Sequence, residues 1–413
     1  DLFISIDTDR DARTITITDN GIGMDKEALE ANLGTIAHSG SLEYKSDEEI
    51  KESDEIDIIG QFGVGFYSAF MVADHVKVIT KAYGSDQAYV WESEGLEGYD
   101  ITEGERDGHG TTIILTLREN NDDFNYDQFL SNYALEDLIK RYSDYVRYPI
   151  TMKFTRSVPV EKPEDAGDDW KQEYREEDEV CTVNSMVPIW TRKKSEVTDE
   201  EYNEFYKTTF RDDADPAAVI SIHAEGTISY DALLFIPSHA PREMLTRGFK
   251  KGLMLYSSNV MIMEKCEELL PDYFGFVRGV VDSPDLSLNI SREMLQQSRE
   301  LSAIQRRIEK KVKGELEKMR DEDREKYEQV YRFFGPNFKF SIYSTYGGTS
   351  QILSDLLMFP SVKEGKLVTL EEYVAKATED QDKIYFATGD SIEQMSATPV
   401  VKAVAAKGYD VLL

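Results

Sequence analysis

The sequence has few cysteines and no long hydrophobic segment. Only two of its 413 residues are cysteines, Cys181 and Cys266, and neither belongs to a paired motif. This pattern argues against a disulfide framework and against a zinc site. No apolar run approaches the ~20 residues that a membrane-spanning helix needs, and no signal peptide is visible. We therefore expect a cytoplasmic protein in a reducing setting, without a membrane partner.

Basic residues are also scarce. Lys and Arg number 47 against 79 Asp and Glu, so the formal net charge is −32. Such a surface repels phosphate backbones, and we expect no nucleic-acid partner. It also keeps a protein soluble while it handles sticky partners, although many bacterial cytosolic proteins are simply acidic. Hydrophobic residues make up 40% of the chain, which is enough for folded cores. At ~100–200 residues per domain, the length predicts two or three domains.

Hydrophobic patterns along the chain predict a mixed α/β (α+β) protein. Alternating or continuous apolar runs predict strands at 1–8, 13–18, 75–81, 87–93, 111–117, 217–224, 228–236, 253–263, 274–281 and 383–389. Apolar residues on one helical face predict helices at 25–33, 126–146 and 301–319. Two acid-rich stretches, 46–57 and 161–180, have the composition of a mobile segment and of a linker. Because the chain begins and ends within predicted strands and lacks an initial Met, we interpret it as a fragment.

A polar turn follows the second predicted strand. Residues 19–24 read Asp-Asn-Gly-Ile-Gly-Met. An Asp at the end of a buried strand can accept a hydrogen bond from an exocyclic adenine amine, while Gly21 and Gly23 let the backbone turn tightly beside the base. Alone, the same pattern also fits an ordinary strand-to-helix turn.

A second glycine pattern, Gly60-x-x-Gly63-x-Gly65, leads directly into an apolar helical segment. Glycines expose backbone N–H groups and a helix N-terminus adds positive potential, so the two together suit phosphate groups. The pattern lacks the Gly-Lys-Ser/Thr ending of a Walker loop. No strand immediately precedes it, as a Rossmann fingerprint would require. Alone, this loop is also a weak signal.

The two glycine patterns occur in order with residues 33–40 (Leu-Gly-Thr-Ile-Ala-His-Ser-Gly) between them and Gly110-Thr111 after them. In this order and spacing the sequence resembles the GHKL ATPase superfamily. The sequence of residues 60–70 resembles that of the ninety-kilodalton heat-shock chaperones, and of their bacterial members in particular, rather than that of DNA gyrase or MutL. It reads Gly-Gln-Phe-Gly-Val-Gly-Phe-Tyr-Ser-Ala-Phe. The resemblance covers nearly all of the chain. It implies an N-terminal Bergerat-type two-layer α/β sandwich followed by a middle domain with αβα layers.

The resemblance implies roles for individual residues around the base and sugar of ATP. Asp19 would anchor the adenine, Gly23 and Met24 would line the base, and Thr111 would assist through water. Asn32 would lie near the sugar and phosphates.

For the phosphates, the resemblance implies a lid at 34–62 and a row of backbone amides contributed by Gly63, Val64, Gly65 and Phe66. His38 stands where the family usually has Lys. A neutral imidazole attracts phosphate less than an ammonium group does. The His38 side chain would therefore either contact phosphate or point into solvent, and both alternatives are kept.

A catalytic loop is implied at 286–296. There Arg292 would reach the γ-phosphate, with Gln296 nearby, and the guanidinium fork matches phosphate oxygens. The alternative is a surface Arg paired with an acid such as Glu293. The family's general-base Glu and magnesium-binding Asn belong to a helix upstream of Asp1, so no residue here is assigned to either role. We therefore expect this fragment to bind nucleotide weakly and to hydrolyse it hardly at all.

The implied function is an ATP-dependent molecular chaperone in protein folding and the stress response, with ATP and Mg²⁺, client proteins, and a homodimer formed through a C-terminal domain absent here. The expected divisions are an ATP-binding domain without its N-terminal part (1–155), an acidic linker (156–185), and the large (186–345) and small αβα (346–413) parts of the middle domain. Two alternatives remain: a GHKL-type DNA-handling ATPase similar to gyrase or MutL, which the charge disfavours, and a nucleotide-independent holdase. Trp190 is either a core residue or a client contact.

Overall fold

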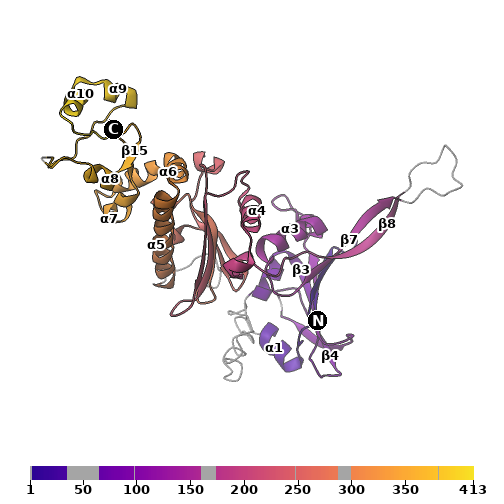
Figure 1. The fold of residues 1–413 in the computed structure, drawn as a ribbon. Coiled ribbons are helices and arrows are strands. Elements are labelled where there is room, and N and C mark those ends of the chain that lie inside the picture. The colour runs from indigo at the N-terminus through magenta and orange to yellow at the C-terminus, as the bar shows by residue number, and fades with distance from the viewer. Residues whose placement is uncertain are drawn as a thin grey trace, which may run out of the picture. The chain divides into compact units, whose positions relative to one another are not determined.

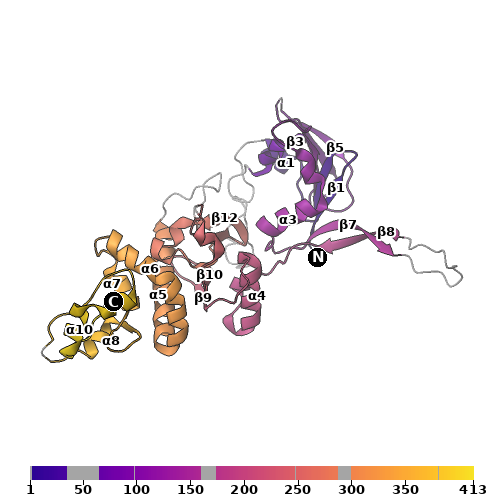
Figure 2. The same ribbon diagram turned by 90° about the horizontal axis from the view of Figure 1, so that it is seen from above.

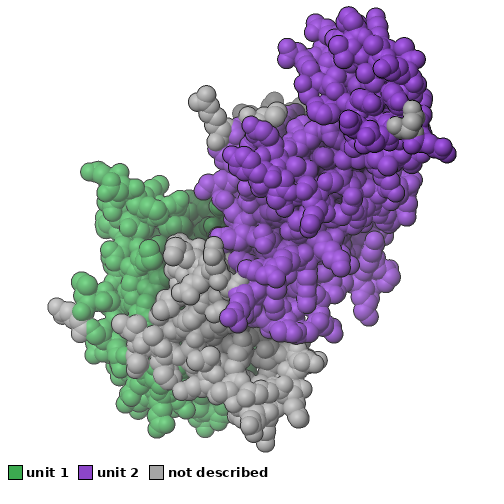
Figure 3. All heavy atoms as spheres, turned by 90° about the vertical axis from the view of Figure 1, so that its left-hand side faces the viewer, with its two compact units in different colours: residues 1–188, 256–262, 288–294 green, residues 189–255, 263–287, 295–413 purple. Residues whose placement is uncertain are grey.

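The computed structural model (Figure 1) describes residues 2–34, 65–96, 98–159, 174–246, 248–286, 299–379 and 381–413. The chain divides into two compact units. The first comprises residues 1–188, 256–262 and 288–294, and the second comprises residues 189–255, 263–287 and 295–413 (Figure 3). Each unit contains its own large sheet with helices, which confirms the predicted mixed α/β class.

The first unit is built on an eight-stranded sheet in the order β5-β4-β3-β6-β2-β1-β7-β8. Its strands are β1 (Ile4–Asp9), β2 (Thr14–Asp19), β3 (Ala73–Lys81), β4 (Ala88–Ser93), β5 (Asp100–Gly104), β6 (Gly110–Leu117), β7 (Ile150–Pro159) and β8 (Tyr174–Thr182). Strands β1 and β7 pair in parallel, and the other neighbours pair antiparallel. The five strands predicted before residue 120 are confirmed, whereas β5 was not predicted.

Helices of the first unit pack their apolar side chains on this sheet. Those among the described residues are α1 (Lys26–Gly34), the 3-10 helices η1 (Gly65–Met71) and η2 (Tyr126–Leu130), and α3 (Asn132–Tyr142). Leu29 and Leu33 of α1 share a core with Trp91, and Ile139 of α3 shares one with Met152. The unit is therefore an α/β sandwich, as predicted. The single helix predicted over 126–146 is interrupted, because the backbone at Ser131 is extended between η2 and α3.

Part of the acidic stretch predicted as a linker forms a strand. Residues 174–182 form β8, which pairs along its whole length with β7. The acids are balanced across the strands, since Lys153 lies 2.6 Å from Asp178 and Arg156 lies 2.8 Å from Glu179. Opposite charges on diagonally adjacent positions of paired strands stabilise the pairing, so these residues of the predicted linker form a regular strand.

A five-stranded sheet in the order β12-β11-β13-β10-β9 lies mostly within the second unit. Its strands are β9 (Ala218–Ala224), β10 (Tyr230–Ile236), β11 (Leu253–Ser257), β12 (Val260–Cys266) and β13 (Arg278–Asp282). The one long strand predicted over 253–263 is wrong. Ser258 and Asn259 both have positive φ, 50° and 65°, and this is the geometry of a two-residue turn that joins antiparallel strands.

Helices lie on both faces of this second sheet (Figures 1 and 2). Helix α4 (Asp199–Phe210) covers one face, where its Tyr206 ring lies 5.2 Å from that of Phe235 on β10. On the other face, α5 (Arg299–Glu322) buries the predicted apolar row Leu301, Ile304, Ile308, Val312, Leu316 and Met319. These layers form the αβα arrangement. Trp190 is only 1% exposed, so its interpretation as a core residue is confirmed and that as a client contact is wrong.

The remaining elements of the second unit are mostly short. They comprise α6 (Arg324–Ser344), α7 (Ser350–Leu353), α8 (Leu370–Ala375), α9 (Ile392–Ala397), α10 (Pro399–Ala406), β14 (Met358–Pro360), β15 (Leu367–Thr369), and the 3-10 helices η3 (Ile189–Thr191), η4 (Lys194–Glu196), η5 (Arg242–Leu245), η6 (Glu267–Leu269), η7 (Asp272–Phe274) and η8 (Ser354–Leu356).

The strand predicted at 383–389 does not form. Phe386 makes one isolated bridge to Leu412, and its side chain is 72% exposed. The apolar run therefore lacks the continuous neighbouring strand that a buried strand needs. Among the helices that the structure describes, none is long and apolar enough to cross a membrane.

Candidate nucleotide-binding site

Asp19 ends strand β2, and its carboxylate is held by backbone groups. Its Oδ1 accepts hydrogen bonds from the N–H of Gly21 at 2.8 Å and from the N–H of Thr111 at 3.3 Å. None of the residues that the structure describes donates a hydrogen bond to Oδ2. The carboxylate is thus fixed through one oxygen, while its second oxygen can accept a hydrogen bond from a ligand.

Two glycines allow three backbone segments to meet beside Asp19. Gly23 has φ +63° and Gly110 has φ +116°, both in the region that favours glycine. A Cβ at Gly23 would overlap the carbonyl oxygen of Lys81, and a Cβ at Gly110 would overlap that of Asp19. The turn after β2, the end of β3 and the start of β6 can therefore approach one another closely only because both glycines lack side chains.

Thr80, which the sequence analysis did not single out, links the predicted residues Met24 and Thr111. The Thr80 side chain is fully buried, and its hydroxyl oxygen accepts the N–H of Met24 at 2.9 Å. The same oxygen lies 3.2 Å from the hydroxyl of Thr111 and 3.2 Å from the carbonyl of Gly110. The sequence contained no local signal for this role, because Thr80 and Thr111 meet only through the register of β3 and β6.

Arg106 and His109 hold the turn after Asp19 through hydrogen bonds to its backbone carbonyls. The Arg106 guanidinium donates to the carbonyl of Asp19 at 2.8 Å and to that of His109 at 2.7 Å. The Nδ1 of His109 donates to the carbonyl of Gly21 at 2.6 Å, and its ring lies edge-on to Tyr83. The sequence analysis missed both residues, although a glycine-containing run directly before Thr111 was a signal that this loop approaches other backbone.

The predicted sugar and phosphate residues that are described belong to α1 and η1. Asn32 lies on α1, and Gly65 and Phe66 open η1. The ring of Phe66 is half-buried and packs edge-on against Trp91, with the ring centroids 5.4 Å apart. Tyr67 ties the two elements together, since its hydroxyl donates to the carbonyl of Leu33 at 2.9 Å. Burial raises the pKa of the Tyr67 phenol, which keeps that donor protonated.

Asp19, Gly23, Met24 and Thr111 are thus brought together around Thr80. The predicted residues outside the described parts of the chain are His38, Gly63, Val64, Arg292 and Gln296, together with the lid segment from residue 35 onward. Their roles stay predictions.

Comparisons with known families agree with this fold. Residues 2–103 match the family described as "Histidine kinase-, DNA gyrase B-, and HSP90-like ATPase", which defines the class of the first unit. Residues 160–413 match the family described as "Hsp90 protein". The chain belongs to the Hsp90 family, as its resemblance predicted.

Curated bacterial relatives are similar over essentially the whole chain. It is 52% identical over 412 residues to the chaperone protein HtpG of Clostridium perfringens, covering 100% of this chain and 65% of that protein. It is 51% identical over 410 residues to the chaperone protein HtpG of Bacillus subtilis, covering 99% of this chain and 64% of that protein. The chain therefore spans slightly less than two thirds of the length of these relatives.

Proposed function

We propose that the intact protein is an ATP-dependent molecular chaperone that couples nucleotide binding and hydrolysis to conformational change on client proteins. The observation that supports this best is the Asp19 carboxylate, held through Oδ1 by two backbone N–H groups beside a turn that only glycine can form. The nucleotide site supports ATP binding, and the chaperone part of the proposal rests on the names of the relatives.

The proposed adenine contact follows from hydrogen-bond chemistry. Oδ2 of Asp19 accepts a hydrogen bond from the exocyclic amine of adenine. Guanine carries a carbonyl oxygen at the equivalent ring position, and two acceptors repel each other. The site should therefore prefer ATP to GTP. Thr80 positions the backbone of Met24 against the base, and Arg106 together with His109 keeps the turn from opening.

The phosphates are proposed to lie toward α1 and η1. There Asn32 and the backbone amides of 63–66 hold them, His38 belongs to the lid, and Arg292 with Gln296 completes the site for hydrolysis. Mg²⁺ is expected to accompany the nucleotide. Because neither its ligand nor the general base is assigned to any residue of this chain, we expect the 413-residue chain alone to be nearly inactive as an ATPase.

We further propose that the intact protein is a cytoplasmic homodimer. The divisions at 1–155, 156–185, 186–345 and 346–413 remain our proposal for its domain roles, with nucleotide binding in the first and the catalytic loop in the third.

Calorimetric titration of the full-length protein with ATP tests the nucleotide site. Asp19→Asn places an amide where the carboxylate accepts its hydrogen bonds, and we expect ATP affinity to fall at least ~100-fold with an unchanged circular dichroism spectrum. Asp11→Asn, in the exposed turn between β1 and β2, is the matched control and should bind as the wild type does. Unchanged affinity in Asp19→Asn would refute the adenine-anchor role.

Client aggregation tests the chaperone function. The full-length protein should suppress aggregation of a heat-denatured client to different extents with and without ATP, and Asp19→Asn should remove that difference. Equal protection under both conditions in the wild type would contradict an ATP-driven mechanism.

A further inference from the structure

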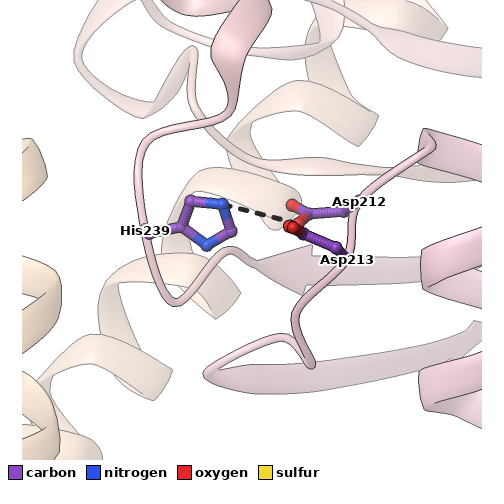
Figure 4. A group of neighbouring side chains, drawn as sticks. All are labelled: Asp212, Asp213 and His239. Atoms are coloured by element: carbon purple, nitrogen blue, oxygen red, sulfur yellow. Dashed lines mark ion pairs between the residues drawn. The ribbon is translucent and has the colours of Figure 1, made fainter.

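Three side chains with metal-binding chemistry converge in the second unit, in residues that the proposed nucleotide site does not include. Asp212 and Asp213 follow α4, and His239 follows β10 (Figure 4). One ligand atom from each of these residues lies within 4.8 Å of the others. They therefore present one imidazole nitrogen and two carboxylate oxygens to a common point.

Local structure fixes the first of these ligands. Helix α4 ends at Phe210, and Arg211 adopts a left-handed conformation with φ 53°, which turns the chain so that Asp212 faces inward. The Asp212 side chain is only 6% exposed. Its Oδ2 accepts the hydroxyl of Tyr206 at 2.7 Å and its Oδ1 accepts the N–H of Ala214 at 3.2 Å. The carboxylate is thus positioned before any ion binds.

The two other ligands are accessible. Asp213 is exposed and forms no hydrogen bond or ion pair with the residues that the structure describes. Nε2 of His239 lies 3.5 Å from Oδ1 of Asp212, and its side chain is 34% exposed. Figure 4 shows the two carboxylates pointing toward the imidazole. The site is therefore open to solvent on the side of Asp213 and His239.

The two carboxylates lie among both basic and acidic side chains. They line a cavity of about 480 Å³ together with Lys207, Arg211, Arg242 and Glu243. Lys207 pairs with Asp215 at 2.8 Å, and Glu243 is engaged by Arg278 and Lys265. Since like charges this close repel each other, a bound cation would relieve the repulsion between Asp212 and Asp213.

We propose that Asp212, Asp213 and His239 bind a divalent transition-metal ion of the zinc class. Zinc accepts imidazole nitrogen and carboxylate oxygen as ligands in tetrahedral sites, and three protein ligands leave one position for water from the cavity. Calcium and magnesium select all-oxygen ligand sets, so the imidazole argues against them. A bound ion would tie the end of α4 to the loop after β10.

Titration of the chelator-stripped 413-residue chain with Zn²⁺ and with Co²⁺ tests this site. We expect one equivalent of Co²⁺ to produce visible d–d absorption that Zn²⁺ removes, whereas Mg²⁺ and Ca²⁺ do not. His239→Gln and Asp213→Asn should each lower Zn²⁺ affinity at least about tenfold, since loss of even an outer partner commonly costs ~10–100-fold. Asp213 is exposed, so its substitution leaves the fold intact, which an unchanged melting temperature without metal verifies.

His223→Gln is the matched control. His223 also faces a carboxylate, Asp231, at 2.8 Å on the same sheet, but it belongs to no three-ligand group among the described residues. Its substitution should leave Zn²⁺ affinity unchanged. The proposal is overturned if the wild-type chain binds no Zn²⁺ or Co²⁺. It is also overturned if His239→Gln and Asp213→Asn bind as the wild type does, or if His223→Gln weakens binding as much as His239→Gln.

Discussion

The two large sheets of this protein differ in how completely they are buried. In β2 of the first sheet only Ile15 among six residues is fully buried, whereas all five residues of β13 in the second sheet are. The first sheet is packed by α1, η1, η2 and α3, and its strand end carries Asp19. The second lies between α4 and α5 (Figures 1 and 2). A sheet covered on both faces stabilises the fold, whereas partly exposed strand ends keep polar groups accessible to a ligand.

The largest expected effect is a cavity in the fully covered sheet. Phe235→Ala in β10 removes a side chain that is 0% exposed and packs against Tyr206, so we expect a loss of about 3–5 kcal/mol in unfolding free energy. Ile17→Ala in the half-buried β2 should lose only ~1–2 kcal/mol. Denaturant unfolding of variants that keep a single tryptophan, Trp190 in the second unit or Trp91 in the first, measures both losses by fluorescence. Equal losses would contradict the comparison.

The next effect concerns the glycine turn of the first sheet. Gly23→Ala adds a Cβ that would overlap the carbonyl of Lys81, and we expect about 2–3 kcal/mol of destabilisation together with weaker ATP binding. Gly84→Ala is the matched control, since its φ is also positive at 79° but no atom lies within 4 Å of the added carbon. It should cost about 1 kcal/mol from backbone strain alone and leave ATP affinity unchanged. Similar ATP affinities in both variants would show that the close approach at Gly23 does not shape the site.

A smaller effect is expected at Thr80. Thr80→Val keeps the shape but leaves the N–H of Met24 without its acceptor, and this should weaken ATP binding by about tenfold. Thr18→Val removes a comparable hydroxyl contact, the 3.2 Å pair with Thr112, and should leave ATP affinity unchanged. Calorimetry on the full-length variants distinguishes them. If Thr18→Val weakens ATP binding as much as Thr80→Val, Thr80 has no particular positioning role.

The smallest effect is a pH dependence in the second sheet. Burial raises the pKa of the Cys266 thiol to about 12 from its ordinary 9.0. The unfolded chain therefore loses this proton first, and stability falls as pH rises. From about pH 8 to about pH 9.5 the loss should be ~1 kcal/mol. Cys266→Ala should remove this part of the alkaline slope, and Cys181→Ala, on β8 of the first sheet, should not. Parallel slopes in both variants would contradict the assignment.

The contrast between the sheets was partly predictable from sequence. The continuous apolar run Ala-Leu-Leu-Phe-Ile of β10 indicates burial on both faces, while the Ile and Thr alternation of β2 indicates one exposed face. The α5 core row was also predicted, because helical spacing is a local property. The hairpin at Ser258–Asn259 was missed, since neither residue is Gly and apolar residues continue on both sides.

The residues that position the site were less predictable. Asp19, Gly23 and Met24 occur together in the sequence, so their turn was visible as a motif. Thr80, Arg106 and His109 reach it only through strand register and loop closure between distant segments. The absence of a strand at 383–389 had the same cause. An apolar run forms a strand only where tertiary structure supplies a neighbour, and local sequence does not contain that information.

The central claim is that ATP binds with its adenine at the end of β2. A crystal structure of the full-length protein with a non-hydrolysable ATP analogue measures this directly. The account predicts that the exocyclic nitrogen of adenine lies about 2.7–3.2 Å from Oδ2 of Asp19, while Oδ1 keeps its bonds to Gly21 and Thr111. Adenine bound elsewhere, with no contact to the Asp19 carboxylate, would contradict it.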